Sequence, residues 1–157
     1  MRHQTGEFIT KFLEKHAYPK KVLEVGSLDV NGNIRRLLDG NSFIGIDMRP
    51  GACVDIQMNA HDLLTKFEPN TFDCVICFDT LEHDDKFWLT VDNMKKVLQV
   101  GGYMLIGVPG RMCPLHDHPS DYWRFMPNGV VSMFEGFDDI FAVNEPDDET
   151  YMWGRKI

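Results

Sequence analysis

The chain has 157 residues, of which 43% are hydrophobic and 25% are charged, and its formal net charge at pH 7 is −8. These values are ordinary for a globular protein, so we exclude disordered and fibrous classes and expect one domain over residues 1–157. The acidic balance argues against nucleic acid as the main partner, because that affinity depends on clustered Lys and Arg. No apolar run is long enough for a signal peptide or a membrane span. We therefore expect a cytoplasmic protein without a membrane partner. We expect it to be a monomer or a homodimer.

Helical and strand patterns alternate along the chain, and glycine and proline separate them. In chain order they predict helix 5–16, strand 21–26, helix 33–38, strands 42–47 and 54–58, helix 61–67, strand 72–78, helix 83–100, strand 103–108, helix 127–134 and strands 137–143 and 151–157. The helix within segment 1–20 should cover one side of the sheet, and Gly101-Gly102 should end the helix at 83–100.

This order predicts an α/β fold: a doubly wound, mostly parallel, Rossmann-like sheet with an antiparallel C-terminal hairpin and helices on both faces. The strand at 72–78 is the most continuously apolar and should lie at the centre of the sheet. It contains Cys74 and Cys77, whose offset of three sends their side chains to opposite faces. We therefore expect these cysteines to pack in the core, without a shared metal or disulfide.

The first two strands end on residues that suit a nucleoside. Asp47 follows Gly26 by 21 residues, close to the offset at which a carboxylate meets a ribose hydroxyl in a Rossmann-type unit. A dinucleotide would also need a glycine-rich seat for its pyrophosphate, yet Leu28 and Asp29 occupy this loop. S-adenosylmethionine carries no phosphate and is cationic, which suits a loop flanked by Glu24, Asp29 and Asp47.

Four segments, each at the carboxyl end of a predicted strand, carry a family resemblance: Val22–Gly26, Ile44–Asp47, Asn59–Leu63 and Phe72–His83. Together they resemble the class I S-adenosylmethionine-dependent methyltransferases, in particular the type 11 group, from Val22 to Phe134. The first loop is about two residues longer than the family's tight glycine-rich loop, with Gly32 as its next glycine.

The resemblance implies a cofactor site built from Glu24, Gly26, Ser27, Asp47, Met48, Asp62, Leu63, Phe78 and Asp79. Glu24 would orient the first loop and the methionyl ammonium, and Gly26 would admit the backbone to the cofactor. Asp47 would accept hydrogen bonds from the ribose. Asp62 would accept one from the adenine amino group with Leu63 packed on the ring, and Phe78 and Asp79 would line the methionyl arm.

His83 has two readings. It follows the central strand and has a pKa suited to a general base near neutral pH, or it simply begins the next helix. A base is needed only if the methyl acceptor must lose a proton, since alignment alone supplies much of the acceleration in such a displacement.

The loop at 110–126 is rich in His, Asp, Pro and aromatic residues and is predicted to be the active-site loop. His116 and His118 are further candidate bases. Tyr122 and Trp123 would wall off water, and Arg124 would clamp an acceptor carboxylate or phosphate. Alternatively, Trp123 and Phe125 dock the loop on the core and Arg124 pairs with Asp121.

A metal site from Cys113, His116 and His118 would lack a clear fourth ligand, so no metal is expected. The sequence thus predicts methyl transfer from S-adenosylmethionine to a small-molecule or glycan-like acceptor. Acceptor specificity would come from loop 110–126, segment 1–18 or a second subunit. One alternative is a non-catalytic S-adenosylmethionine-binding module, and another is a dinucleotide oxidoreductase.

Overall fold

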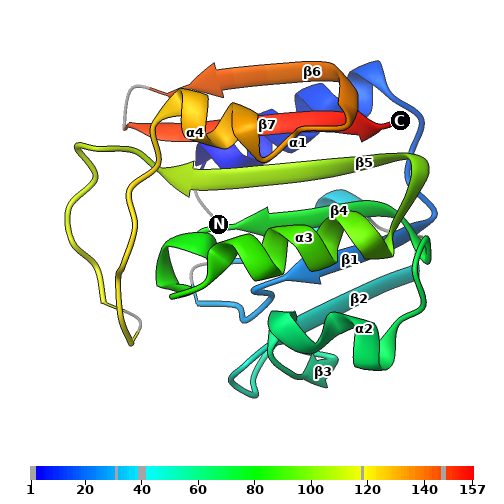
Figure 1. Ribbon diagram of the computed structural model, residues 1–157, viewed down its shortest axis with the longest axis horizontal. Helices are drawn as coiled ribbons and strands as arrows, with labels where there is room; N and C mark the ends of the chain where they lie inside the picture. The colour runs from blue at the N-terminus through cyan, green and yellow to red at the C-terminus, as the bar shows by residue number, and fades with distance from the viewer. Residues whose placement is uncertain (1–2, 31, 39–41, 118, 146–147) are drawn as a thin grey trace.

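The computed structural model describes residues 3–30, 32–38, 42–117, 119–145 and 148–157, and its centre is a seven-stranded sheet (Figure 1). The strands are β1 (Lys21–Val25), β2 (Ser42–Asp47), β3 (Ile56–Gln57), β4 (Phe72–Phe78), β5 (Leu98–Pro109), β6 (Phe137–Asn144) and β7 (Glu149–Lys156), in the order β3-β2-β1-β4-β5-β7-β6. Strands β1 to β5 pair in parallel, whereas β7 runs antiparallel to both β5 and β6. The predicted fold class, with β4 at its centre, is confirmed.

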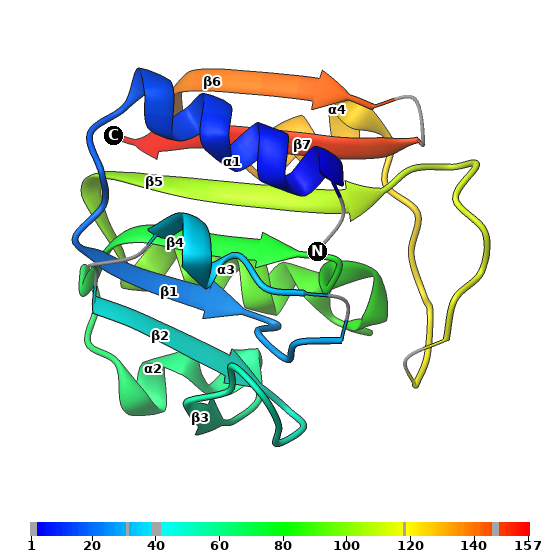
Figure 2. The same cartoon turned by 180° about the vertical axis from the view of Figure 1, so that it is seen from behind.

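Helices cover both faces of this sheet. The helices are α1 (His3–Lys15), α2 (Leu63–Lys66), α3 (Phe87–Val97) and α4 (Pro127–Ser132), with shorter 3-10 helices η1 (Arg35–Leu38), η2 (Ala60–Asp62) and η3 (Leu81–His83). Helices α2, α3 and α4 lie on one face, and α1 and η1 lie on the other (Figures 1 and 2). Each face has its own buried apolar cluster, with Cys77 in the first and Cys74 in the second. The prediction that these two cysteines face opposite ways is confirmed.

The predicted helix at 83–100 was too long. It ends at Val97, and Leu98 is already extended and pairs with Phe72. Gly101 and Gly102 therefore lie inside β5 and do not end the helix. The pairing shifts register between Phe72 and Cys74, and Gly101 has a φ of +82° at this irregularity. Glycine adopts that conformation readily and is therefore favoured at an irregularity in a strand. In the sequence, such a glycine looks the same as one that ends a helix.

Other predicted elements are present but shorter. Of the strand predicted at 54–58 only Ile56 and Gln57 pair, and the predicted helix at 33–38 is the 3-10 helix η1. The helix predicted at 61–67 is divided between η2 and α2. Residues 39–41, which follow the predicted helix at 33–38, and residues 146–147, within the predicted C-terminal hairpin, lie outside the described residues.

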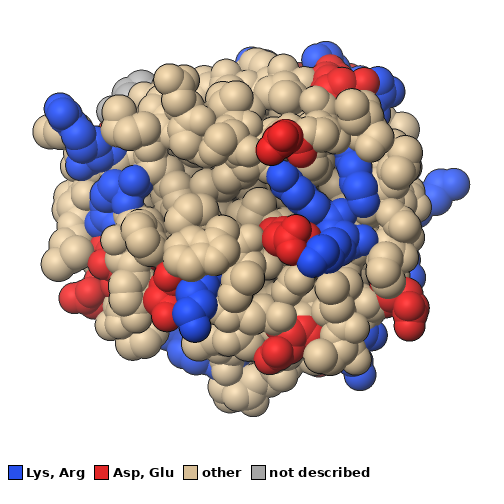
Figure 3. All heavy atoms as spheres, in the orientation of Figure 1, with Lys and Arg blue, Asp and Glu red and all other residues tan. Residues whose placement is uncertain are grey.

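The carboxyl ends of β1, β2, β4 and β5 meet at one edge of the sheet, and the segment 110–126 leaves β5 at that same edge (Figure 1). In an open α/β sheet, this edge is where ligands bind. Acidic and basic side chains of the described residues are interspersed on the face that carries α3 (Figure 3). Within the described part of the chain, no helix has the length and apolarity needed to cross a membrane.

Candidate active site

A cavity of about 750 Å³ opens at the carboxyl ends of the parallel strands, a volume suited to a small ligand. Its lining contains five carboxylates, namely Glu24, Asp47, Asp79, Asp84 and Asp85. Arg49 is the only Lys or Arg among the described residues that line it. The cavity is therefore a favourable environment for a cation.

Glu24, at the carboxyl end of β1, is the most perturbed carboxyl group of this cavity. Its residue is 8% exposed, and burial raises its pKa to about 8. Glu24 Oε2 and the nearby Ser27 Oγ are buried and have no hydrogen-bond partner among the described residues. Because such buried polar atoms are costly unless they are paired, both are suited to receive donors from a ligand.

Asp47 is held in place by the backbone around it. Its Oδ1 accepts a hydrogen bond from Arg49 N at 2.8 Å, and its Oδ2 accepts one from Leu28 N at 3.3 Å. A carboxylate has about four acceptor positions, so both oxygens retain capacity toward the cavity. Met48, which the sequence also assigned to the cofactor, lines the cavity beside it.

The lengthened first loop is folded around its own carboxylate. Asp29 accepts hydrogen bonds from Gly32 N at 2.6 Å and from Asn33 Nδ2 at 2.9 Å. In a dinucleotide site the backbone N–H groups of this loop face the pyrophosphate. Here the Asp29 carboxylate accepts a hydrogen bond from one of these N–H groups. This argues against the oxidoreductase alternative.

The end of β4 closes the cavity floor with a strained backbone. Phe78 and Asp79 line the cavity as predicted, and Asp79 has a φ of +48°, which is uncommon for a residue with a side chain. A Cβ added to Gly26 would lie 1.9 Å from Thr80 Oγ1. Gly26 is therefore required for the close approach of β1 to the turn after β4.

The predicted adenine contacts are not where the sequence suggested. Leu63 is fully buried in the α3-side core, Asp62 is exposed, and neither belongs to the cavity lining. The chain turns into η2 earlier than predicted, because Asn59 caps it by accepting a hydrogen bond from His61 N at 2.9 Å. The lining at this position is formed by Met58, Asn59, Ala60 and His61.

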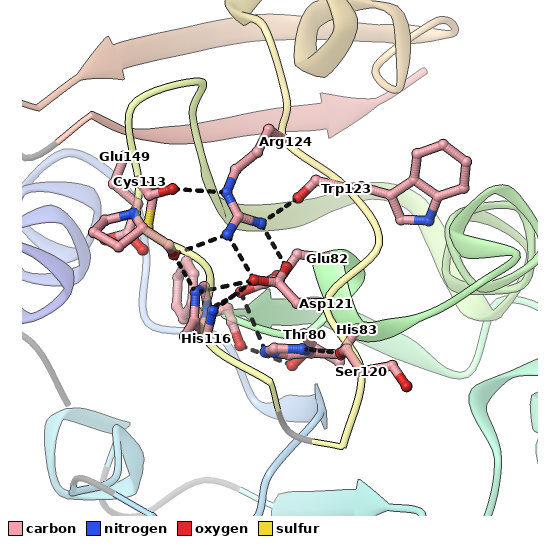
Figure 4. Close-up of polar contacts among 12 residues, drawn as sticks. Thr80, Glu82, His83, Cys113, His116, Ser120, Asp121, Trp123, Arg124 and Glu149 are labelled. Atoms are coloured by element: carbon pink, nitrogen blue, oxygen red, sulfur yellow. Dashed lines mark hydrogen bonds and ion pairs between the residues drawn. The ribbon is translucent and has the colours of Figure 1, made fainter.

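Two predicted histidines meet in the lining of the same cavity. The rings of His83 and His116 pack edge to face with centroids 5.1 Å apart, and both line the cavity (Figure 4). The loop is pinned on η3 because Tyr122 N donates to the Glu82 carbonyl oxygen at 2.7 Å. Tyr122 also lines the cavity, whereas His118 lies outside the described residues.

Trp123 and Arg124, for which the sequence predicted acceptor roles, are not among the residues that line the cavity. Trp123 packs against Phe87 and Trp88, and its Nε1 donates to the Asp84 carbonyl oxygen at 2.8 Å. The guanidinium of Arg124 donates two hydrogen bonds to the Asp121 carboxylate, at 2.5 and 2.6 Å. Its remaining donors are used as well, on the carbonyl oxygens of residues 113, 114 and 123.

All five N–H donors of Arg124 are thus engaged inside the loop, so none is left for an acceptor carboxylate or phosphate (Figure 4). The alternative reading of Trp123 as an anchor and of Arg124 as the partner of Asp121 is confirmed. The Arg124 hydrogen bonds also hold the pKa of Asp121 well below its usual range.

Replacing Arg124 by Ala should therefore lower stability. The expected loss is about 2–3 kcal/mol, because the buried Asp121 carboxylate loses charge-assisted hydrogen bonds. Urea unfolding of the variant measures this, with Arg111→Ala, an exposed residue of the same loop, as the control. A fully stable Arg124→Ala chain that had lost only acceptor affinity would restore the clamp reading.

Sequence reasoning missed Glu82, which is completely buried beside the two histidines. The described residues bring Glu82 together with His83 and His116, with one ligand atom from each lying within 4.8 Å of the others. Cys113 is not part of this group. The only signal in the sequence was the direct adjacency of Glu82 and His83.

A family model described as a methyltransferase domain matches residues 1–138. Similar solved structures include a SAM-dependent methyltransferase from Archaeoglobus fulgidus, with 13% identity, a TM-score of 0.77 and coverage of 99% of this chain and 95% of that one. The 1,6-didemethyltoxoflavin-N1-methyltransferase of Burkholderia thailandensis, solved with 1,6-didemethyltoxoflavin and S-adenosylhomocysteine, has 15% identity, a TM-score of 0.74 and coverage of 98% and 77%. No curated protein matches the sequence.

A third similar structure is phosphoethanolamine N-methyltransferase 2 of Haemonchus contortus, with 14% identity, a TM-score of 0.72 and coverage of 98% of this chain and 53% of that one. At such identities, likeness to solved structures shows the fold, whereas the family model covers most of the chain. The type 11 subgroup stays a prediction. The chain belongs to the class I S-adenosylmethionine-dependent methyltransferases.

Proposed function

We propose that this chain transfers a methyl group from S-adenosylmethionine to an oxygen or nitrogen atom of a small-molecule or glycan-like acceptor. The observation that carries the proposal is one acidic cavity whose lining includes both Glu24, a carboxyl group with an unsatisfied oxygen, and the packed rings of His83 and His116. When bound, the cofactor supplies a methyl group on a positively charged sulfur, which leaves with the electron pair of the carbon–sulfur bond.

The residues present fit the cofactor. Glu24 Oε2 and Ser27 Oγ, both buried and unpartnered among the described residues, would receive the donors of the methionyl ammonium. Asp47 would receive the ribose hydroxyls through its remaining acceptor positions. The wall of residues 58–61, with Met48, would enclose the adenine in place of Asp62 and Leu63. Phe78 and Asp79 would line the methionyl arm.

The acceptor would occupy the end of the cavity lined by His83, His116 and Tyr122. An oxygen or nitrogen nucleophile must lose a proton to become a neutral methylated product. The two imidazoles favour that loss at the site where the acceptor would lie. The half-exposed Tyr122 covers this end and restricts access of water to it.

Incubation with methyl-labelled S-adenosylmethionine and a panel of small hydroxyl, amine and glycan acceptors tests this function. We expect label to pass to at least one acceptor class, with S-adenosylhomocysteine formed in equal amount. Tight cofactor binding without any transfer across the panel would instead favour the non-catalytic binding module. In such a non-catalytic binding module, His83 and His116 would have no catalytic role.

Replacing Asp47 by Ala should weaken binding of S-adenosylhomocysteine by about 1–3 kcal/mol, through loss of hydrogen bonds to a carboxylate. Calorimetric titration measures the change, and Asp92→Ala, an exposed carboxylate on α3, serves as the control. Unchanged affinity in Asp47→Ala would refute the ribose role.

A further inference from the structure

Glu82 is buried completely, yet its carboxylate is not satisfied. It lies on η3, is 0% exposed, and neither of its carboxylate oxygens accepts a hydrogen bond from the described residues. The nearest ring nitrogens are His116 Nε2, 3.5 Å from Oε1, and His83 Nε2, 3.7 Å from Oε1. Both distances exceed those of a normal hydrogen bond. A carboxylate buried in this state must either bind a proton or acquire a positive partner.

The backbone sets the tautomer of both histidines. His83 Nδ1 lies 2.6 Å from the Ser120 carbonyl oxygen, and His116 Nδ1 lies 3.0 Å from the Pro114 carbonyl oxygen. A carbonyl oxygen only accepts hydrogen bonds, so each Nδ1 carries the hydrogen, and Nε2 of each neutral ring carries the electron pair. The two Nε2 atoms are the ones directed at Glu82 (Figure 4).

Three electron-pair donors therefore converge on one point: two imidazole nitrogens and a carboxylate oxygen, all within 4.8 Å of one another. With neither a proton nor a cation among them, the electron pairs of these atoms repel one another. A histidine whose Nδ1–H donates to a backbone carbonyl, which leaves Nε2 to bind an ion, has the arrangement that metal-binding histidines usually show. Two histidines and one carboxylate suit Fe²⁺, Co²⁺, Mn²⁺ or Zn²⁺, whereas Mg²⁺ and Ca²⁺ prefer oxygen ligands.

We propose that Glu82, His83 and His116 bind one divalent transition-metal ion, with its remaining coordination positions facing the cavity. Both histidines line that cavity, so the acceptor atom would complete the coordination shell. The sequence analysis expected no metal because it considered Cys113 and His118 as partners of His116 and did not consider Glu82.

A metal ion at this site would activate the acceptor for the proposed methyl transfer. This consequence rests on the proposed function, whereas metal binding itself does not. A coordinated hydroxyl group has a lowered pKa and releases its proton to solvent. Its oxygen then forms the bond to the methyl carbon as the carbon–sulfur bond breaks, and the electron pair stays on sulfur. The metal keeps its oxidation state. With the ion bound, Nε2 of His83 is a ligand, so the metal takes over the removal of the proton that the free imidazoles would otherwise favour.

Cobalt tests the site on the unmodified chain. Metal-stripped protein is titrated with Co²⁺ by calorimetry, and the complex is examined by proton NMR. We expect one ion per chain and two exchangeable, paramagnetically shifted resonances from the Nδ1–H groups of His83 and His116. Absence of stoichiometric binding, or a complex without these resonances, would overturn the proposal in favour of a proton shared within the cluster.

Variants then locate the ion. Glu82→Gln and His116→Ala are each expected to weaken Co²⁺ binding at least tenfold, whereas His3→Ala, which removes an exposed histidine of α1, should leave it unchanged. Circular dichroism verifies that each variant is folded. Co²⁺ affinity that is equal in all four chains would place the ion elsewhere and refute the assignment.

The same chains are titrated with S-adenosylhomocysteine. Glu24 and Asp47 line the cavity, whereas Glu82 is not among its lining residues. Cofactor affinity should therefore change less than twofold in Glu82→Gln. Metal binding without cofactor binding would refute the proposed function and leave the metal site standing. Cofactor binding without metal binding would refute the metal site and leave the proposed function standing.

Discussion

Replacing Glu24 by Gln is expected to weaken binding of S-adenosylhomocysteine at pH 8.5 by about 1.5–3 kcal/mol, roughly 10- to 100-fold. The reason is that the ionised Glu24 carboxylate would pair with the ligand's ammonium in a buried position, where a neutral amide cannot replace the charge. Calorimetry measures the affinity, and Glu7→Gln, an exposed carboxylate of α1, is the matched control. Equal affinities of Glu24→Gln and the unmodified chain would remove Glu24 from the site.

The pH dependence of the same titration follows from the raised pKa of Glu24. At pH 7 this group is mostly protonated, because burial raises its pKa to about 8. Pairing with an ammonium would ionise it, so binding releases a proton and affinity rises with pH, by at most about tenfold per unit, up to about pH 8. The Gln variant should lack this Glu24-linked rise.

Stability of the ligand-free chain should change with pH in the opposite direction. The folded chain holds the Glu24 proton more tightly than the unfolded chain, so this group's contribution is fully present below about pH 4.5 and is lost as pH rises toward 8. The Glu24→Gln variant lacks this loss. Its stability relative to the unmodified chain should therefore increase between pH 5 and 8, as measured by urea unfolding.

Replacing Gly26 by Ala should destabilise the fold by about 2–5 kcal/mol, from overpacking together with backbone strain. Gly26 has a φ of +79°, and the new Cβ would lie 1.9 Å from Thr80 Oγ1, so β1 and the turn after β4 would have to separate. Thermal unfolding should show a decrease in Tm of roughly 5–15 °C. Cofactor binding should fall with it, because the loop after β1 forms one wall of the cavity.

Two further chains make the Gly26 result specific. Gly129→Ala in α4 places its Cβ in open space and should alter stability by less than about 1 kcal/mol. Adding Thr80→Gly to Gly26→Ala removes the clash but leaves the backbone strain and loses the hydrogen bond from Thr80 Oγ1 to the Phe78 carbonyl oxygen. Part of the stability should therefore return. A Gly26→Ala chain as stable as the original would contradict the close packing described at this position.

The features that the sequence analysis predicted correctly are those recorded in local patterns. A buried strand requires a continuous apolar run whatever surrounds it, so 72–78 could be placed at the centre of the sheet and its cysteines on opposite faces. The strand ends then located Glu24, Gly26, Asp47 and Phe78 at one edge, and the structure places all four around one cavity.

The features that it missed depend on contacts between distant residues. The sequence around Arg124 does not indicate that all its donors are used inside its own loop. It also does not indicate that Trp123 packs on α3. Asp62 and Asn59 are both reasonable ligands by type, and only the cap that begins η2 directs the chain so that Asn59 lines the cavity. Likewise, His116 joins Glu82 only because the loop folds back onto η3.

Titration of the unmodified chain with S-adenosylhomocysteine at pH 7, in two buffers of different ionisation enthalpy, tests the central claim most directly. If the acidic cavity binds this cofactor through Glu24, the heats will fit one site per chain and differ between buffers by the release of about one proton. A chain that gives no heat and no thermal shift at millimolar ligand would contradict the assignment of this cavity.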